Sequence, residues 1–421
     1  LPISYPFCYR TDTPLIYKSI SSWFVNVEAI RDLLIQNNSN INWVPSHIKE
    51  GRFGKWLEGA RDWAISRNRF WGTPIPIWKC TSCKKLSCIG SVEELEERTG
   101  AKVTDLHSHF IDHLEMPCKG CGSVMKRIPD VLDCWFESGS MPYAQAHYPF
   151  ENKEEFDSNF PADFIAEGLD QTRGWFYTLL VLSTALFGRT SFKNVIVNGI
   201  LLAEDGKKMS KSLKNYPPPN EVMDEIGSDA MRLYLLSSAA TRAEDLRFSK
   251  TGVTQVVRQT MLPLWNAYNF FVTYALVDGW TPNDAPKEPS PNLLDRWMMS
   301  KVASLVQAVD TVLSSYHLYL AAPPILEFVE QLTNWYIRLN RRRFWAGNSG
   351  DAKSDKFHAY NTLHQSLLTF VRVLAPLAPF ISEEIFRNLS KGVSSLSFES
   401  VHLAPFPSLS ELSGVTIDSE L

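Results

Sequence analysis

The chain has 421 residues, of which 44% are hydrophobic and 21% are charged, and its formal net charge is −4. This composition is typical of a soluble protein with buried cores, and the length is enough for two to four domains. No apolar run approaches the roughly 18 residues that span a bilayer, so no membrane segment is expected. Because a weakly acidic chain has no overall basic field, any nucleic-acid-binding surface must concentrate positive charge locally.

The first part of the chain, residues 1–78, has mixed character. It begins with Leu1 and has no charged and then apolar leader, which predicts a chain that begins inside a longer protein. The spacing of apolar residues predicts a helix over residues 23–34. A second helix is predicted over residues 54–69, which carry Arg61, Arg67 and Arg69 beside Trp56 and Trp63.

Residues 79–130 hold five of the seven cysteines and little continuous apolar sequence, which predicts a small insertion stabilised by something other than a core. Short-spaced thiol pairs in an odd-numbered set favour metal binding in a reducing compartment over disulfides. Two Cys-x-x-Cys pairs can complete a tetrahedral four-thiolate shell, which is the pattern of a structural zinc site without an open position for water. The predicted ligands are Cys80, Cys83, Cys118 and Cys121, and His107, His109 and His113 between the pairs are alternative ligands.

Residues 131–216 show α/β character. Strands are predicted at residues 164–166 and 195–197, and an apolar helix at residues 174–186. A turn is predicted at Glu204-Asp205-Gly206, and Lys207-Lys208-Met209-Ser210-Lys211-Ser212 follows it. A lysine ammonium group binds phosphate as a compact point charge, so this loop can contact a polyphosphate. The alternative is a solvated surface loop, as most lysine-rich loops are.

The remainder of the chain reads as mostly helical. Residues 217–280 show helical spacing, and the proline-rich segment 281–291 predicts a linker. Amphipathic helices over residues 294–316, 325–343 and 358–374 then predict an α-helical bundle.

The second of these helices is basic. Arg338, Arg341 and Arg342 fall at i, i+3 and i+4, so they can share one helix face. Arginines with interleaved aromatic residues can contact an RNA backbone and stack on bases. The alternative is a helix with a solvated basic face.

Several segments resemble one enzyme family. Residues 208–212 match, letter for letter, the KMSKS signature of class I aminoacyl-tRNA synthetases. Residues 167–176 (Glu-Gly-Leu-Asp-Gln-Thr-Arg-Gly-Trp-Phe) resemble the amino-acid-site motif of isoleucyl-tRNA synthetases. Valyl and leucyl relatives differ at the position of the Asp170-Gln171 pair.

The resemblance extends along nearly the whole chain. Residues 61–72 are similar to the stretch that follows the editing insertion in this family, and residues 133–139 to another family motif. Residues 334–336 and 340–343 resemble the anticodon-binding domain. The sequence at residues 138–143 is more similar to the eukaryotic cytosolic branch than to the bacterial one.

The resemblance implies the C-terminal half of a Rossmann-like α/β nucleotide-binding fold with a small zinc-bearing insertion, followed by an all-α anticodon-binding bundle. The implied domains are a segment after the editing insertion (1–78), the zinc-binding insertion (79–130), the second half of the catalytic domain with the lysine loop (131–216), a helical stem-contact or connecting region (217–280) and the anticodon-binding domain (292–421).

The implied activity is ATP-dependent conversion of isoleucine to isoleucyl-adenylate, with Mg²⁺, and transfer of the acyl group to the isoleucine tRNA. By resemblance, Lys208 and Lys211 hold the β- and γ-phosphates, and Ser210 and Ser212 donate hydrogen bonds or shape the loop. The implied substrate-binding set is Glu167, Gly168, Asp170, Gln171, Trp135 and Trp175. The two tryptophans would line the side-chain pocket, and Asp170 would attract the substrate ammonium group. The implied tRNA-binding set is Trp335, Arg338, Arg341, Arg342 and Arg343.

Two family features are absent from the sequence. No histidine occurs in a His-x-Gly-His motif, and the editing domain is missing apart from a returning segment near the start. The chain is therefore expected to lack a first half of the catalytic domain and to be inactive alone. Cytoplasmic location and association with other synthetases are further expectations. The alternatives are a non-catalytic tRNA-binding or scaffold protein derived from a synthetase, and a valyl-tRNA synthetase.

Overall fold

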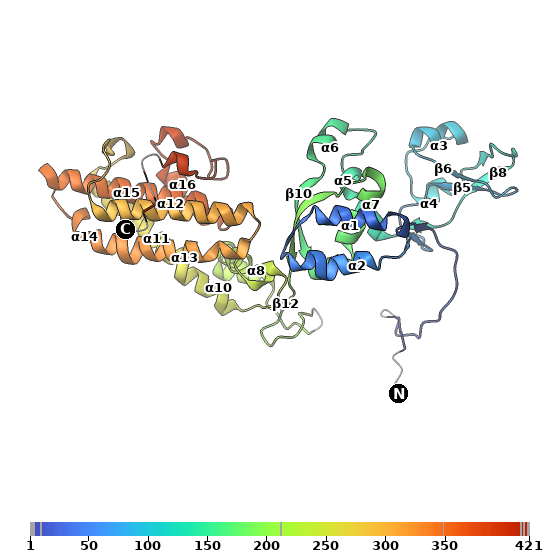
Figure 1. The fold of residues 1–421 in the computed structure, drawn as a ribbon, viewed down its shortest axis with the longest axis horizontal. Helices are drawn as coiled ribbons and strands as arrows, with labels where there is room; N and C mark the ends of the chain where they lie inside the picture. Colours follow the sequence, from blue (N-terminus) through green and yellow to red (C-terminus); the bar gives the residue numbers. More distant parts are fainter. Residues whose placement is uncertain are drawn as a thin grey trace. The chain divides into compact units, whose positions relative to one another are not determined.

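The computed structural model of the chain describes residues 5–8, 11–210, 213–347, 349–412, 415 and 417–418. The chain divides into two compact units (Figure 1). Unit 1 comprises Leu1–Asn42, Ser46–Phe164 and Asp170–Lys193, and unit 2 comprises Trp43–Pro45, Ile165–Leu169 and Asn194–Leu421.

Unit 1 is built around the apolar helix α7. Its helices are α1 (Arg31–Ser39), α2 (Lys55–Glu58), α5 (Cys134–Ala144), α6 (Lys153–Asn159) and α7 (Trp175–Phe187). Helix α7 is apolar over most of its circumference and is buried from Phe176 to Thr184, as expected for a helix without a polar face. It ends at Gly188, whose φ of +68° is the left-handed conformation that glycine adopts at a helix C-terminus. The helix predicted at residues 174–186 is thus confirmed.

The cysteine-rich segment forms a small sheet with its own core. The four strands β5 (Ile77–Cys80), β6 (Leu86–Cys88), β7 (Met116–Pro117) and β8 (Val124–Arg127) pair in the order β6-β5-β8-β7. Helices α3 (Val92–Thr99) and α4 (Ser108–Ile111) complete this segment. A buried cluster includes Trp78, Ile89, Leu95, Leu114 and Met125. The prediction of an insertion without a core is therefore wrong, because its few apolar residues are spread along the sequence but meet in space.

The two helices predicted in the first part of the chain have other bounds in the structure: α1 begins later than expected and extends to Ser39, and α2 is shorter than expected. Strand β1 (Phe24–Val25) precedes α1 and pairs antiparallel with β3 (Trp63–Ala64). Helix α2 stops at Glu58, and β4 (Ser66–Arg67) pairs antiparallel with β9 (Val131–Leu132). Pairing with distant strands overrides the local helical spacing here, because each strand gains backbone hydrogen bonds that no local pattern reveals.

A three-stranded sheet contains the strands predicted near residues 164 and 195. Strands β10 (Ala162–Gly168), β11 (Phe192–Asn198) and β2 (Asn42–Val44) are hydrogen-bonded in the order β10-β11-β2. Val195, Ile196 and Val197 on β11 are buried, as a β-branched strand in a covered sheet requires.

Unit 2 begins with a short α/β region. Strands β12 (Leu201–Leu202) and β13 (Leu246–Arg247) pair in parallel. Helices α8 (Pro219–Ile226), α9 (Ser228–Leu236) and α10 (Lys250–Val256) surround a separate small core of Val222, Ala230, Phe248 and Val253.

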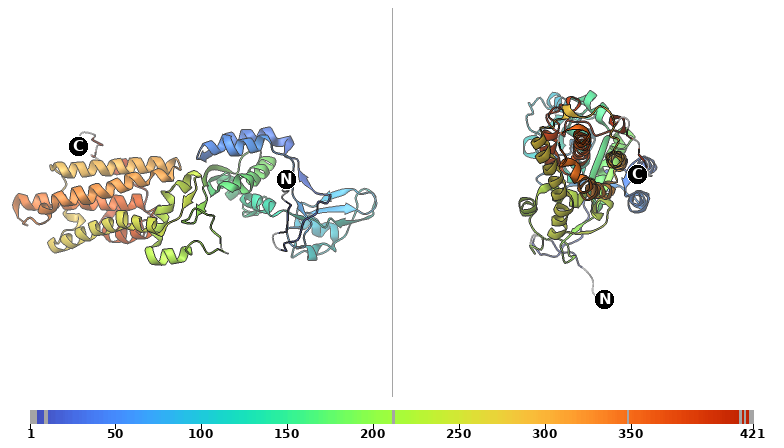
Figure 2. Two further views of the ribbon diagram at one scale, coloured as in Figure 1. Left: turned by 90° about the horizontal axis from the view of Figure 1, so that it is seen from below. Right: turned by 90° about the vertical axis from the view of Figure 1, so that its left-hand side faces the viewer.

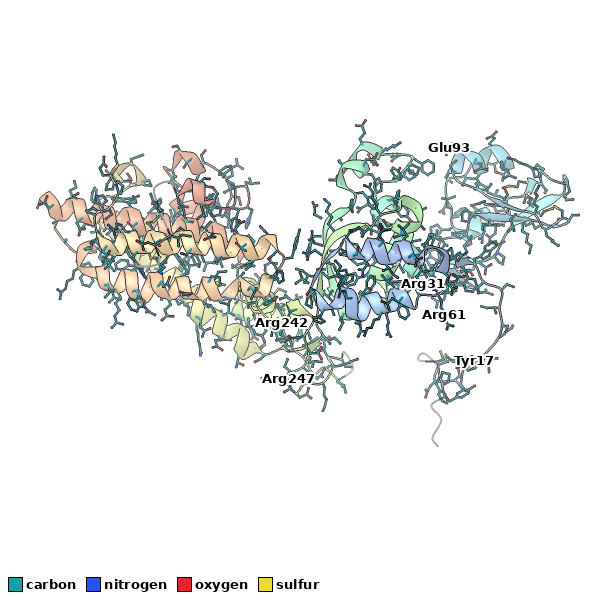
Figure 3. All side chains as sticks on the ribbon, in the orientation of Figure 1. Tyr17, Arg31, Arg61, Glu93, Arg242 and Arg247 are labelled. Atoms are coloured by element: carbon teal, nitrogen blue, oxygen red, sulfur yellow. The ribbon has the colours of Figure 1, made fainter. Side chains whose placement is uncertain are left out.

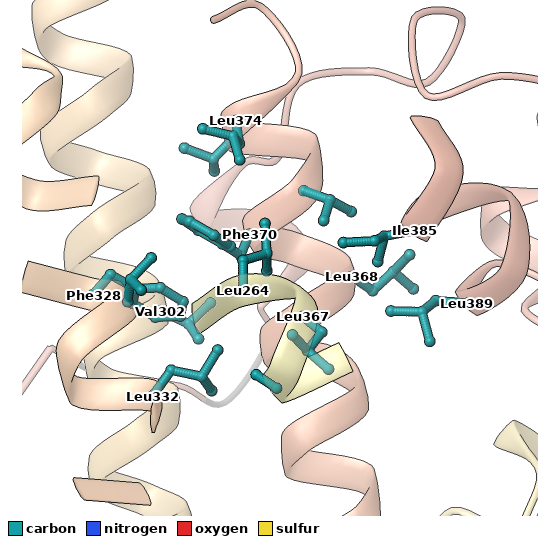
Figure 4. Close-up of a cluster of buried hydrophobic side chains, with 14 of the residues drawn as sticks. Leu264, Val302, Phe328, Leu332, Leu367, Leu368, Phe370, Leu374, Ile385 and Leu389 are labelled. Atoms are coloured by element: carbon teal, nitrogen blue, oxygen red, sulfur yellow. The ribbon is translucent and has the colours of Figure 1, made fainter. Parts of the chain in front are cut away.

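The rest of unit 2 is a helical bundle, and it includes α11 (Leu262–Asp278) from the segment that the sequence assigned to the connecting region. Its other helices are α12 (Leu293–Ser314), α13 (Ala322–Glu330), α14 (Arg338–Phe344), α15 (Gly350–Leu374) and α16 (Pro379–Leu389). A π-helical segment, Gln331–Ile337, joins α13 to α14. The long helices run side by side in two views (Figures 1 and 2), and leucines and phenylalanines from several of them interdigitate in the core (Figure 4). Within the described ranges, no helix is both long enough and apolar enough to cross a membrane.

Candidate functional site

The lysine loop leaves β12 through a tight turn. Gly206 has a φ of +80°, which favours glycine, and its N–H donates to the Ala203 carbonyl at 2.8 Å. The Ala203 N–H donates to the Lys207 carbonyl, also at 2.8 Å, and Leu202 forms a β-bridge with Lys208. The turn thus brings Lys208 back beside the strand with its side chain exposed.

The strand that leads into this turn is fixed by close backbone packing. A Cβ on Gly199 would lie 1.8 Å from the carbonyl oxygen of Glu244, so only glycine fits there. The Gly199 N–H donates to Ala240 at 2.7 Å, and the Ile200 and Leu202 carbonyls accept N–H groups from Leu246 and Phe248 at 2.9 Å. The base of the lysine loop is therefore anchored to residues 240–248.

Asn215 holds the two described ends of the loop together. Its side-chain oxygen accepts the Ser210 N–H at 2.9 Å, and its side-chain nitrogen donates to the Lys208 carbonyl at 3.1 Å. No sequence motif pointed to Asn215, although an asparagine just after a loop is a common source of such side-chain to backbone bonds. Of the four predicted loop residues, Lys211 and Ser212 lie outside the described residues.

Four of the predicted substrate-binding residues meet around Gly174 in unit 1. The Trp175 N–H donates to Gln171 Oε1 at 2.8 Å, and Gln171 Nε2 donates to Asp170 Oδ2 at 2.9 Å. A Cβ on Gly174 would lie 3.2 Å from the Trp135 ring and 2.7 Å from Gln171 Oε1, so these side chains are adjacent and a larger residue would collide. The Trp175 indole N–H donates to the Ser138 carbonyl at 3.0 Å.

Trp135 owes its position to the start of helix α5. The carboxylate of Asp133 accepts the Trp135 N–H at 2.6 Å and caps the helix. Asp133 is 2% exposed and forms an ion pair with Arg67 on β4. Close packing against α7 is possible because a Cβ on Gly139 would lie 2.9 Å from Leu182. Arg67 and Asp133 thus position Trp135. Each lies in one of the family motifs at residues 61–72 and 133–139, but the sequence prediction gave neither residue a role.

The two remaining predicted substrate residues are the last two residues of strand β10. Glu167 is exposed and Gly168 is half-buried. The 3₁₀ turn Leu169–Arg173 follows directly and contains Asp170 and Gln171. Glu167 and Gly168 therefore lie at the end of a strand, the usual place for ligand-binding groups in α/β folds.

The four predicted metal ligands converge in unit 1. The Sγ atoms of Cys80, Cys83, Cys118 and Cys121 all lie within 4.8 Å of one another. Two of the separations are 3.5 Å (Cys80–Cys121) and 3.7 Å (Cys83–Cys118). A tetrahedral zinc ion with bonds of about 2.3 Å places its sulfur ligands roughly 3.8 Å apart, so the cluster fits such an ion. Across the described residues, no histidine joins this group.

The thiols of this cluster differ in acidity. Hydrogen bonds from the Ser123 side chain and backbone lower the pKa of Cys121 to about 6. The Lys85 N–H lowers the pKa of Cys83, but the neighbouring thiols outweigh it and raise that pKa to about 11. Opposite shifts are expected of thiols that share protons at close range. A bound cation would favour the thiolate form of all four.

The predicted RNA-binding face lies on α14 and the π-helical segment before it. Arg338, Arg341 and Arg342 are exposed. Trp335 and Trp345 are 56% and 57% exposed, which leaves their rings available for stacking. We call these five residues the basic aromatic face.

The neighbouring Arg343 does not belong to this face. Its guanidinium bonds to Asp295 and Asp355 with nitrogen–oxygen distances of 2.7–2.9 Å. Tyr336 and Phe344, which flank the arginines in the sequence, are buried in the bundle core. The structure therefore gives Arg343 a structural role, because its charge is neutralised within the protein.

Two family models match the chain. One, described as tRNA synthetases class I (I, L, M and V), matches residues 10–248. The other, described as the anticodon-binding domain of tRNA ligase, matches residues 295–421.

Similar proteins include several bacterial isoleucine–tRNA ligases. That of Treponema denticola is 54% identical over 97% of this chain, and that of Chlamydia abortus is 57% identical over 96%. The chain spans about 38% of the length of these relatives.

Solved structures share the fold at low sequence identity. A methionyl-tRNA synthetase of Mycobacterium tuberculosis bound by methionyl-adenylate has a TM-score of 0.68 and 17% identity, over 96% of this chain and 71% of that one. The LeuRS–tRNA–LeuAMS complex of Agrobacterium radiobacter K84 has a TM-score of 0.59 and 22% identity, over 87% of this chain and 46% of that one. The Rossmann-like catalytic fold followed by a helical anticodon-binding domain is thereby confirmed.

Proposed function

Because the chain belongs to the class I tRNA synthetases of the I, L, M and V group, we propose that it acts as part of an isoleucine–tRNA ligase. The observation that supports this proposal best is 54–57% identity to isoleucine–tRNA ligases over 96–97% of the chain. Its portion of the reaction would be handling of the nucleotide and amino acid by residues 131–216 and tRNA recognition by residues 292–421. In this proposal, residues 1–78 are the segment that returns from the editing insertion, and residues 79–130 are the zinc-binding insertion. Residues 217–280 are the connecting region.

In the proposed reaction, the isoleucine carboxylate attacks the α-phosphorus of ATP. The new carboxyl–phosphate bond gives isoleucyl-adenylate, and the broken phosphate bond releases pyrophosphate. Negative charge shifts onto the leaving phosphates in the transition state, so fixed positive charge there lowers the barrier. Lys208 and Lys211 would supply that charge, and Ser210 and Ser212 would donate hydrogen bonds. Attack of a terminal tRNA hydroxyl on the acyl carbon then transfers isoleucine and releases AMP.

The amino acid would bind at the cluster around Gly174. Trp135 and Trp175 offer apolar ring surface to an aliphatic side chain, and the Asp170 side chain would pair with the substrate ammonium group. Gln171 holds both Asp170 and the Trp175 backbone, which supports a positioning role for it. Glu167 and Gly168 would contact the adenylate from the end of β10.

Four further assignments follow the same proposal. The four-cysteine cluster would hold a structural Zn²⁺, since the sulfur separations suit that ion and leave no open ligand position. Mg²⁺ would accompany ATP. The basic aromatic face would bind the isoleucine tRNA. Thiolate ligands must remain reduced, which supports a cytoplasmic location.

Two finer expectations have less support. The eukaryotic cytosolic type rests on residues 138–143 alone, and the bacterial relatives give it no support. Association with other synthetases in a complex is the second of these expectations.

The decisive experiment is amino-acid-dependent exchange of pyrophosphate into ATP. Exchange by the full-length protein is expected with isoleucine and to be far weaker with valine, and this chain alone is expected to be inactive. Equal or stronger exchange with valine would favour a valyl-tRNA synthetase. Absence of exchange with retained tRNA binding would favour the non-catalytic alternative. Pyrophosphate exchange by this chain alone would contradict the expectation that its catalytic site is incomplete.

A further inference from the structure

Unit 1 contains a cavity that the proposed function does not use. Its volume is about 510 Å³, within the range of small-molecule sites. Strand β5, the start of helix α3, and the loop between α5 and α6 contribute to its walls. We call it the Glu93 pocket. None of its lining residues belongs to the proposed substrate, phosphate, tRNA or metal sets.

The interior of the Glu93 pocket is apolar. Trp78, Ile89, Leu95 and Ile111 line it and are at most 5% exposed. The only polar side-chain atom of Trp78, its indole nitrogen, donates to the Leu114 carbonyl at 2.9 Å. Trp78 is therefore fully satisfied and adds only carbon surface to the pocket, which suits an apolar ligand body.

The rim of the pocket is acidic. Glu93 lies in the first turn of α3 (Figure 3) and lines the pocket. Glu151 also lines the pocket, and its Oε2 atom lies 3.4 Å from Nδ1 of His147. Glu93 accepts hydrogen bonds from its own backbone N–H and from the Ser91 side chain, and these, with the nearby His147, lower its pKa. The rim thus has two carboxylates and one imidazole, so negative charge is in excess and a cationic ligand group is favoured.

A wall of the pocket near this rim is aromatic. Phe150 lines the pocket, is 56% exposed, and contacts the His147 ring at a centroid distance of 5.4 Å. An exposed phenylalanine beside a cavity can cover a ligand that enters it, and its faces also attract cations.

We propose that the Glu93 pocket binds a hydrophobic amine, with the ammonium group between Glu93 and Glu151 and the apolar body against Trp78 and Phe150. The apolar interior gains from burial of the body, and the acidic rim selects the charge. An anionic ligand of the same shape would bring its charge against the two carboxylates and bind more weakly.

The test compares tryptamine with indole-3-propionate, which share an indole ring but have opposite charges. The full 421-residue chain is titrated with each probe and binding is followed by ligand-observed NMR. Tryptamine is expected to bind with a Kd of about 1 mM, typical of a ligand this small, and indole-3-propionate at least several-fold more weakly. Glu93→Gln and Glu151→Gln should each weaken tryptamine binding about two- to five-fold, as partly exposed ion pairs do.

Glu97→Gln is the matched control, since Glu97 is exposed on the same helix but does not line the pocket. Its affinity for tryptamine should equal that of the unmodified chain. Phe150→Ala should weaken tryptamine binding, with circular dichroism confirming that the variant is folded.

Three results would overturn the proposal. The first is equal binding of the two probes, and the second is unchanged affinity when Glu93→Gln and Glu151→Gln are combined. The third is displacement of tryptamine by excess isoleucine, which would place the amine at the Trp135–Trp175 cluster instead. Because the proposed ligase activity is measured separately by pyrophosphate exchange, failure of either proposal leaves the other testable.

Discussion

Arg343 and Asp295 form a bidentate ion pair inside the helical bundle. Arg343 Nη1 lies 2.7 Å from Asp295 Oδ1, and Nη2 lies 2.8 Å from Oδ2. Asp295 is 1% exposed and also accepts the Tyr336 hydroxyl at 2.7 Å. Burial and the adjacent Asp295 raise the pKa of Tyr336 well above its usual range, so this hydroxyl remains a donor. The pair therefore joins α12 to α14 behind the basic aromatic face.

Replacement of Arg343 by alanine should destabilise the bundle strongly. The variant would leave the Asp295 carboxylate buried without its cation, which typically costs about 3–5 kcal/mol of unfolding free energy. Urea unfolding followed by near-ultraviolet circular dichroism measures the change. Arg342→Ala, one residue away and exposed, should change stability by no more than about 0.5 kcal/mol. Equal stability of the two variants would show that the pair contributes little.

Of these two arginines, only Arg342 is expected to contact RNA, because the Arg343 guanidinium is paired with Asp295 and Asp355. The logarithm of the RNA affinity falls as the logarithm of the salt concentration rises. Removing an exposed arginine that contacts a phosphate should make this slope less steep by about 0.7–0.9. Arg342→Ala should therefore weaken binding of the isoleucine tRNA most at low salt. Trp335→Ala should weaken it by about 1–3 kcal/mol if the ring stacks on a base. Binding is measured by filter retention at several salt concentrations, and unchanged slopes would remove the basic aromatic face from the interface.

The four-cysteine cluster should hold about one zinc ion per chain. Elemental analysis of freshly purified protein tests this directly. Cys83→Ser should lose the metal and lower the melting temperature of the cysteine-rich sheet, because the ligand pairs are far apart in sequence and the ion ties them together. Cys88→Ser is the matched control: Cys88 is exposed on the adjacent strand and outside the cluster. A metal-free native protein, or equal loss in both variants, would contradict the assignment.

Asn215 should matter for catalysis in the full-length protein although it bears no charge. Asn215→Ala removes both hydrogen bonds that link Ser210 and Lys208, so the lysine loop should lose its fixed shape. Misplacement of catalytic groups by about 1 Å can cost up to roughly 10²-fold in rate. Lys208→Ala should slow isoleucine-dependent pyrophosphate exchange by about 10²- to 10³-fold, as loss of a transition-state contact does.

Asn215→Gln is the conservative variant for this test. It retains an uncharged amide with both an acceptor for the Ser210 N–H and a donor to the Lys208 carbonyl, on a side chain one methylene longer, so its rate should fall between those of the native protein and Asn215→Ala. The affinity for isoleucine should be unaffected in both variants. A normal exchange rate in Asn215→Ala would show that the loop keeps its shape without this side chain.

Local sequence patterns predicted those features whose residues interact locally or repeat regularly. The apolar stripe of the helix near residues 294–316 places Met298, Val302 and Val309 in the core, as its period requires. The Cys-x-x-Cys spacing predicted the metal cluster because each pair closes on one ion without help from the rest of the fold.

Features that depend on distant partners were not predictable from the sequence. The strand at Trp63–Ala64 forms because it pairs with Phe24–Val25, which no local period reveals. Arg342 and Arg343 are neighbours of the same type, and the positions of Asp295 and Asp355 on two other helices distinguish the solvent-facing arginine from the half-buried one. The acidic rim of the Glu93 pocket likewise joins residues from separate segments.

Acidification should weaken the bundle through His364. This imidazole is buried between Phe271 and Trp280, and its Nε2–H donates to the Leu389 carbonyl at 2.8 Å. Burial lowers the pKa of His364 and outweighs the opposite effect of that hydrogen bond. The unfolded chain therefore binds a proton at a higher pH than the folded chain does. The contribution to stability is complete above the unfolded pKa of about 6.5 and is lost as pH falls from there through the folded pKa.

His364→Gln removes this titration while it keeps a side-chain N–H that can reach the Leu389 carbonyl. The variant should be less stable than the native chain at pH 8, because the imidazole packs against two aromatic rings. The difference should narrow between pH 7 and pH 5, since only the native chain has a buried imidazole to protonate. Urea unfolding at several pH values in this range measures the difference in unfolding free energy. His402→Gln is the control, because His402 is an exposed histidine in the same unit. A constant difference at every pH would mean that His364 stabilises the bundle by packing alone.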